Sequence, residues 1–141
     1  MRLKASTDYA VRALIYLGMK SDTCSSKDIA EEMGIPRDYL IQLALHLRNA
    51  NILKARPGKN GGYTLARPAS KITLGQVMEA FEGEGANRRH PLKATKKSPD
   101  TVHSAVAARR FVEGSFDEFF SKITLEQMLQ AGEEAADSKA R

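Results

Sequence analysis

The sequence lacks the features of an exported or membrane-bound protein. It contains one cysteine, Cys24, and no apolar run of 18 residues. A single cysteine excludes an internal disulfide and favours a reducing compartment. The short apolar runs exclude an ordinary transmembrane helix, and the N-terminus has no signal-peptide pattern. We therefore expect a cytoplasmic protein that does not bind membranes.

The sequence also lacks the residue patterns on which enzymes depend. We find no nucleophile with a matching base, no motif of paired acids and no phosphate-binding fingerprint. The glycine-rich segment from Gly58 to Gly62 is basic and typical of a hairpin, not of a nucleotide loop that opens a helix. We expect no enzymatic activity, no catalytic residues, no bound metal and no cofactor.

The charge of the chain is unevenly distributed. The 141 residues carry a net charge of +5, to which residues 1–83 contribute +4, residues 84–99 another +4 and residues 100–141 contribute −3. This pattern fits a DNA-binding head followed by a separate dimerisation or regulatory region. A mildly basic soluble protein without a polyanionic partner would have a similar total charge.

Apolar spacing and end signals predict six helices and four regions. The helices are expected over 5–20, 26–33, 37–49, 73–81, from Asp100 onward with an interruption at Gly114, and from Thr124 onward. Ser6 or Thr7 is the expected cap of the first helix. The regions are a DNA-binding domain over 1–83, a basic flexible loop over 84–99, a helical dimerisation region over 100–131 and a tail over 132–141, frayed from Glu133 to Arg141.

The segment from Arg37 to Arg67 is the most informative part of the chain. A helix is followed by a strand at Ile52–Ala55, a turn at Pro57–Gly61 and a second strand at Gly62–Ala66. Together with the preceding helix and the Gly34 turn, this order is typical of a winged helix-turn-helix, whose second helix reads the major groove. The expected fold is mainly α with a small β-hairpin, followed by a long dimerisation helix.

Several short motifs resemble a known family. They are Tyr9-Ala10-Val11-Arg12-Ala13-Leu14, Gly34-Ile35-Pro36, Tyr39-Leu40 with Gln42-Leu43, Gly61-Gly62-Tyr63-Thr64-Leu65-Ala66-Arg67-Pro68, Ile72-Thr73-Leu74, Glu82-Gly83 and Ile123-Thr124-Leu125. In this order and spacing they resemble the bacterial winged-helix regulators typified by the iron–sulfur regulator IscR, the nitric-oxide sensor NsrR and the cysteine-metabolism repressor CymR. The resemblance implies a transcriptional regulator, usually a repressor, that binds a pseudo-palindromic operator in double-stranded DNA as a homodimer. It also implies control by a small effector or a protein co-regulator.

The sequence departs from this family at three places. Cluster-binding members have three cysteines in the segment that matches 85–103, where this chain has none, and His90 and His103 do not replace thiolate ligands. We therefore expect no iron–sulfur cluster. Ile41 stands where an acidic residue is frequent, and isoleucine can only contact a thymine methyl group. Pro57 stands where the family has a wing arginine, with Arg56 one residue earlier.

Two sets of candidate binding residues follow. The DNA-binding set comprises Arg37, Asp38, Tyr39, Ile41 and Gln42 on the reading helix, Lys54, Arg56, Lys59, Asn60 and Gly61 on the wing, and Arg2 and Lys4 near the N-terminus. The dimerisation set comprises Val102, Val106, Phe111, Phe116, Phe119 and Phe120. The aromatic residues could also form a ligand cage. The basic segment 88–97 could bind an anionic effector, contact DNA phosphate or bind nothing.

A second functional hypothesis belongs to a different class. The winged helix would then be the scaffold of a protein-interaction adaptor, and the phenylalanine-rich region would bind a metabolic enzyme. DNA affinity distinguishes the two hypotheses, because each phosphate that a protein neutralises releases counterions and makes binding strongly salt-dependent.

Overall fold

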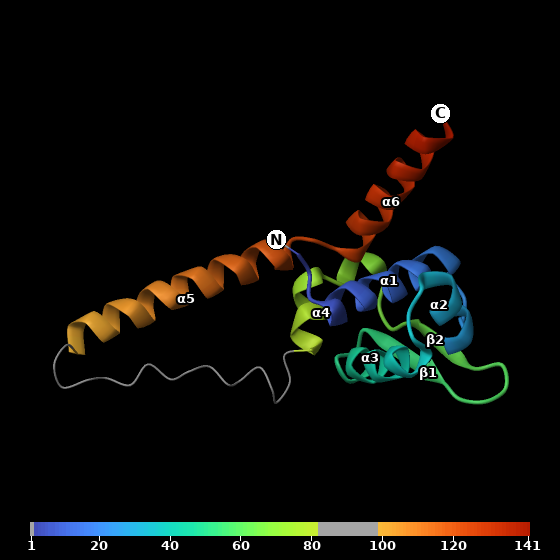
Figure 1. Ribbon diagram of the computed structural model, residues 1–141, viewed down its shortest axis with the longest axis horizontal. Coiled ribbons are helices and arrows are strands. Elements are labelled where there is room, and N and C mark those ends of the chain that lie inside the picture. The colour runs from blue at the N-terminus through green and yellow to red at the C-terminus, as the bar shows by residue number, and fades with distance from the viewer. Residues whose placement is uncertain (1, 82–98) are drawn as a thin grey trace.

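The computed structural model describes residues 2–81 and 99–141, which form a helical body with one β-hairpin and two projecting helices (Figure 1). The elements are α1 (Ala5–Lys20), α2 (Ser26–Met33), α3 (Arg37–Asn49), β1 (Leu53–Arg56), β2 (Gly62–Leu65), η1 (Ala69–Lys71), α4 (Leu74–Ala80), α5 (Pro99–Ser121) and α6 (Leu125–Ala140). The predicted fold class is confirmed. The expected basic loop lies outside the described residues, except for Pro99, and so do His90 and the Glu82-Gly83 motif. Over the described ranges, no helix is long and apolar enough to span a membrane.

The core forms around α1, which contacts α2, α3, α4, α6 and β2. Its buried side chains recur at three- and four-residue steps, as the apolar spacing predicted. The most deeply buried large side chains of the molecule are Leu14, Ile29, Leu40, Leu47, Ile52, Ile72, Val77 and Leu125. One apolar cluster therefore connects the first helix, the helix-turn-helix, the start of β1, η1–α4 and the start of α6.

The N-terminus of α1 differs from the expectation. The helix begins at Ala5 after Lys4, and no side chain caps it. The Lys4 carbonyl already accepts a hydrogen bond of 2.9 Å from the Asp8 amide, so the first helical turn forms before the expected caps, Ser6 and Thr7. Thr7 is buried inside the body instead.

The turn between α2 and α3 follows the sequence signals closely. The Ser25 hydroxyl accepts a hydrogen bond of 3.1 Å from the Asp28 amide and caps α2. Gly34 ends α2 with a φ of 64°, in the left-handed region that favours glycine. Ile35 is buried beneath the turn, and Pro36 precedes the first residue of α3. The angle between the two helices is thus determined by a cap, a glycine and one apolar anchor.

The wing is a two-stranded antiparallel hairpin in which Leu53 pairs with Leu65. Cys24 forms an isolated bridge beside β2: its amide donates to the Tyr63 carbonyl at 3.0 Å, and the Tyr63 amide donates to the Cys24 carbonyl at 2.8 Å. A Cβ atom at Gly62 would collide with the Cys24 carbonyl. The segment before α2 therefore holds the wing against the body, which the sequence did not predict.

A second bridge attaches the C-terminal part of the chain to the body. The Leu74 amide donates to the Ile123 carbonyl, and the Leu125 amide donates to the Ile72 carbonyl, each at 2.8 Å. The two Ile-Thr-Leu motifs thus pair in antiparallel fashion, with Thr73 opposite Thr124.

Each threonine of this pair also caps its own helix. Thr73 and Gln76 form a complete capping box at the start of α4, and Thr124 and Gln127 form another at the start of α6. Because Thr73 and Thr124 lie opposite each other, α4 and α6 begin side by side, each with its own capping box. Both helix starts were predicted, whereas their pairing was not.

The last two helices correct two expectations. Helix α5 continues through Gly114 without interruption, because one glycine costs only about 1 kcal/mol relative to alanine in a helix of favourable residues. Helix α6 continues to Ala140, so the expected fraying from Glu133 is wrong, although these residues are exposed. Alanine and glutamate favour helix there, and the Gln130 amide donates to the Glu134 carboxylate at 3.3 Å.

Candidate nucleic-acid interface

Helix α3 has one buried face and one exposed face. Leu40, Leu43, Ala44 and Leu47 are buried against the body. The opposite side of the helix is exposed, and its exposed residues are Arg37, Asp38, Ile41, Gln42, Leu45, His46, Arg48 and Asn49. The structure therefore presents four of the five sequence-predicted residues of this helix to solvent on one side.

Tyr39, the fifth predicted residue, is half-buried and faces α1. Its ring contacts that of Tyr9 edge to face, with 5.4 Å between the ring centroids. The Arg12 guanidinium lies 5.0 Å from the Tyr9 centroid and forms a two-pronged ion pair with Asp8, at 2.9 and 3.2 Å. This cluster positions the first turn of α3 relative to α1, a function that the sequence did not reveal.

Arg37 is held across the helix-turn-helix. Its Nε donates a hydrogen bond of 3.3 Å to the Ser26 hydroxyl, at the first residue of α2. The side chain nevertheless stays exposed, so the guanidinium retains further N–H groups for a ligand.

The wing presents its polar residues to solvent. Lys54, Arg56, Lys59 and Asn60 are all exposed, while Gly61 is half-buried in the turn. The Gly61 amide donates to the Gly58 carbonyl at 3.0 Å, and Gly58 has a φ of 105°. This turn places three cations along a hairpin that contacts α3 through β1. Arg2 and Lys4 are exposed at the start of α1.

Arg67 is a residue that sequence reasoning left without a role. Its Nε donates to the Asn51 carbonyl and its Nη1 donates to the Lys71 carbonyl, both at 3.1 Å. It thereby connects the loop after α3 to η1 and supports the base of the wing. The signal available in the sequence was its place directly after the second strand of the hairpin.

The candidate dimerisation residues on α5 differ in exposure. Phe120 is buried and contacts the rings of Phe116 and Phe119, with centroid distances of 6.2 and 5.4 Å. It anchors the C-terminal end of α5, which contacts α4, while the rest of the helix projects from the body (Figure 1). Val102 and Val106 are half-buried.

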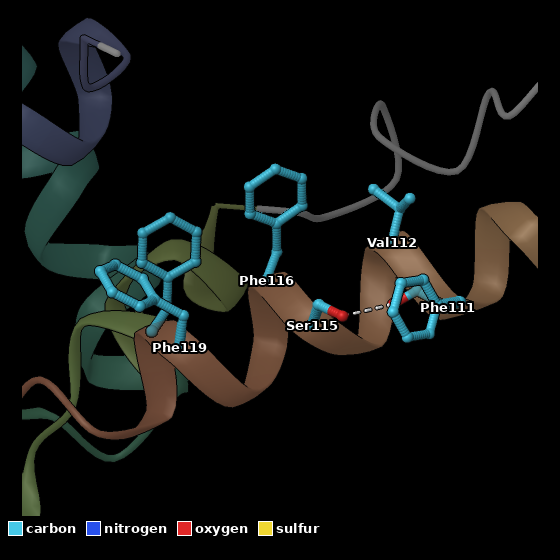
Figure 2. A pocket seen from close by; sticks show the side chains of 6 residues that line it. Phe111, Val112, Ser115, Phe116 and Phe119 are labelled. Atoms are coloured by element: carbon cyan, nitrogen blue, oxygen red, sulfur yellow. Dashed lines mark hydrogen bonds between the residues drawn. The ribbon is translucent and has the colours of Figure 1, made fainter.

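The remaining aromatic residues of α5 form an exposed surface, which we call the Phe patch. Its residues are Phe111, Val112, Phe116 and Phe119, and Figure 2 shows their side chains projecting from the helix. Phe111 is 75% exposed and Phe119 is 58% exposed. Exposed apolar side chains gathered on one helix are typical of interaction surfaces.

The sulfur chemistry of the chain does not suit an iron–sulfur cluster. Such clusters are held by several cysteine thiolates. Cys24 is the one cysteine of the sequence, and it is buried with its thiol donating to the Asp22 carbonyl at 3.4 Å. Burial, with the nearby charges of Asp22 and Asp28, raises the pKa of this thiol. The residues of 2–81 and 99–141 also contain no group of three metal-binding side chains.

A capped helix-turn-helix followed by a two-stranded wing places the molecule in the winged helix-turn-helix class. Residues 3–131 match the Rrf2 family, described as an iron-dependent transcriptional regulator. The chain belongs to this family, which confirms the resemblance found in the sequence. The family and the relatives below are transcriptional regulators and not enzymes, as expected.

Three relatives are similar over most of the chain. The regulator NsrR of Oceanobacillus iheyensis is 32% identical over 139 residues, which cover 95% of this chain and 93% of that protein. The solved structure of IscR from T. potens has a TM-score of 0.72 at 29% identity and covers 96% of this chain and 90% of that one. CymR, the global cysteine regulator of B. subtilis, has a TM-score of 0.66 at 26% identity, covering 93% of this chain and 98% of that one.

Other matches are shorter. The chain spans 56% of the length of a helix-turn-helix regulator of Mycobacterium tuberculosis, with 33% identity over 91 residues. It spans 57% of a Synechocystis relative, with 42% identity over 84 residues.

Proposed function

We propose that this chain is a sequence-specific DNA-binding transcriptional regulator that acts as a homodimer, without an iron–sulfur cluster, and represses its target genes. The observation that carries the proposal is the exposed face of α3 next to a basic wing. Residues 1–83 would form the DNA-binding unit, and residues 100–131 the dimerisation region. The protein would act in the cytoplasm.

The α3 face supplies the groups that read bases. Gln42 can form two hydrogen bonds with adenine, to its N6 amino group and its N7 atom, and Arg37 can bond guanine or phosphate. The wing cations and the N-terminal pair Arg2 and Lys4 would contact phosphates, which position the protein without specifying sequence. Asp38, Asn60 and Gly61 adjoin these groups, and Tyr39 would act mainly by orienting the first turn of α3.

A second copy of the chain is the partner proposed for the Phe patch. Packing of α5 against the same helix of a second protomer would bury aromatic side chains that one chain leaves in water. Such a dimer would present two α3 helices to two half-sites of a pseudo-palindromic operator. A tight dimer is needed because each half-site alone provides few contacts.

Regulation without a cluster requires another signal. The segment 85–103 contains no cysteine, and the buried Cys24 thiol is poorly suited to be a ligand. A small effector or a protein co-regulator would supply the signal.

Two single substitutions test the assignment of the DNA contacts. Gln42→Ala should reduce discrimination between the operator and random DNA by about 1–3 kcal/mol, the value of a bidentate base contact. Lys59→Ala should weaken binding to all duplexes equally and reduce the salt slope by about one phosphate. Unchanged discrimination in the first variant would contradict the role of α3. A sequence-selective loss in the second would show that the wing reads bases.

A further inference from the structure

Two large apolar side chains lie on the exposed face of α3 and have no described neighbour that covers them. Ile41 is 45% exposed and Leu45 is 49% exposed. They are four residues apart, so they lie next to each other on the helix surface. The buried residues of α3 already pack on the opposite face, so neither side chain is needed for the core.

The surroundings of this apolar pair are charged and polar. Arg37 lies four residues before Ile41, and Arg48 lies three residues after Leu45, so an arginine stands at each end of the stripe. Gln42 is exposed beside it. An apolar partner surface would leave the two arginines at the ends of this pair without counter-charges. A ligand with apolar groups at its centre and anionic groups at its edges would match both the apolar pair and the arginines.

The major groove of duplex DNA has this chemistry. The C5-methyl group of thymine is the apolar group on its floor, and phosphates line both edges. The adenine that pairs with thymine offers the two groups that a glutamine can bond. We propose that Ile41 and Leu45 contact thymine methyl groups, so that each half-site contains thymines at two defined positions. This inference deepens the proposed function and rests on it.

The helix geometry gives the spacing of the two thymines. Four residues of an α-helix rise about 6 Å, and successive base pairs of a duplex are about 3.4 Å apart. If α3 lies along the groove, the two methyl groups belong to base pairs about two steps apart. Gln42, next to Ile41 in the sequence, would bond an adenine within the same short stretch.

Removal of single methyl groups tests this inference directly. A duplex operator would first be obtained by selecting the full-length protein's preferred sequence from a random pool. Each thymine would then be replaced by deoxyuridine, which differs only in the methyl group. Affinity should fall about threefold to fourfold at two positions per half-site, because the variant duplex no longer buries one methyl-sized group against the protein. Other thymines should show no effect.

Variants assign each methyl group to its side chain. In Ile41→Ala, deoxyuridine at one of the two positions should no longer weaken binding. In Leu45→Ala, deoxyuridine at the other position should no longer weaken binding. Met19→Ala is the matched control, because Met19 is an exposed apolar residue at the far end of α1. This variant should keep both effects.

The outcomes separate this inference from the function on which it rests. Selective DNA binding without sensitivity to deoxyuridine would overturn the thymine contacts and leave the regulator intact. Failure to select any duplex would overturn both. If Ile41→Ala altered self-association in sedimentation experiments and left the deoxyuridine effects unchanged, the face would be a protein contact and the inference would be wrong.

Discussion

Phe119 offers the sharpest test of the proposed dimer. Its side chain is 58% exposed on the single chain. A phenylalanine can bury about 150–250 Å², so roughly 115 Å² of this side chain is available to a partner. At about 25 cal/mol per Å², complete burial would contribute about 3 kcal/mol per protomer and about 6 kcal/mol per dimer. Partial burial halves this value, so Phe119→Ala should raise the dimer Kd by about 10²- to 10⁴-fold.

Sedimentation equilibrium of the wild type and the variant measures this change. Thermal unfolding of dilute protein is the control for folding, because Phe119 also contacts the Phe120 ring. Phe111→Ala is a second variant, since Phe111 is 75% exposed and lies further along α5 from the body. Met19→Ala again serves as an exposed apolar residue outside the patch. A dimer Kd within threefold of the wild type in both phenylalanine variants would refute the assignment of the Phe patch to the dimer interface.

Three further predictions concern the folding of the body. Gly62→Ala should lower the free energy of unfolding by about 1–3 kcal/mol, because the new Cβ collides with the Cys24 carbonyl; urea denaturation would measure this, and an unchanged midpoint would contradict the close approach. Thr124→Ala should cost about 1 kcal/mol through loss of the α6 cap, whereas equal helicity and stability would show that the cap is redundant. The raised pKa of the Cys24 thiol means that the unfolded chain loses this proton first as the pH rises. Stability from this group is therefore complete below the ordinary thiol pKa and falls above it, and native protein should react with iodoacetamide far more slowly than urea-unfolded protein at pH 8.

Much of the helix-turn-helix and wing was predictable because local residues determine it. Ser25 caps α2 through a neighbour three residues away, and Gly34 ends the same helix by its own backbone conformation. The Pro57–Gly61 turn lies between two short β-rich runs and closes into the expected hairpin. In each case the deciding interaction spans a few residues and is visible in one dimension.

The contacts between distant segments were not predictable from these local rules. The bridge between Cys24 and Tyr63 is made by backbone hydrogen bonds, so the residue types carry no pairing signal. Arg67 bonds two carbonyl groups, which every residue possesses. The sequence assigned all the phenylalanines of α5 to the dimerisation set. The structure instead separates the buried Phe120 from the exposed Phe patch. That division depends on where α5 meets α4.

The length of the last two helices was underestimated for a different reason. The expected break at Gly114 gave too much weight to one glycine, and the expected fraying from Glu133 gave too much weight to the position near the chain end. Helix formation is cooperative, so a long run of favourable neighbours carries the helix through one glycine.

The most direct test of a DNA-binding regulator is a titration of the full chain against the DNA upstream of its own gene and against a random duplex, at about 50 and 200 mM salt. If the exposed α3 face and the basic wing bind DNA as proposed, the upstream DNA should bind more tightly than the random duplex. A protein that contacts six or more phosphates should also lose about 10³-fold or more in affinity between these salt concentrations. Weak binding that is equal for both duplexes and barely changes with salt, and that persists across a random-sequence selection, would contradict the account and favour a protein-interaction adaptor.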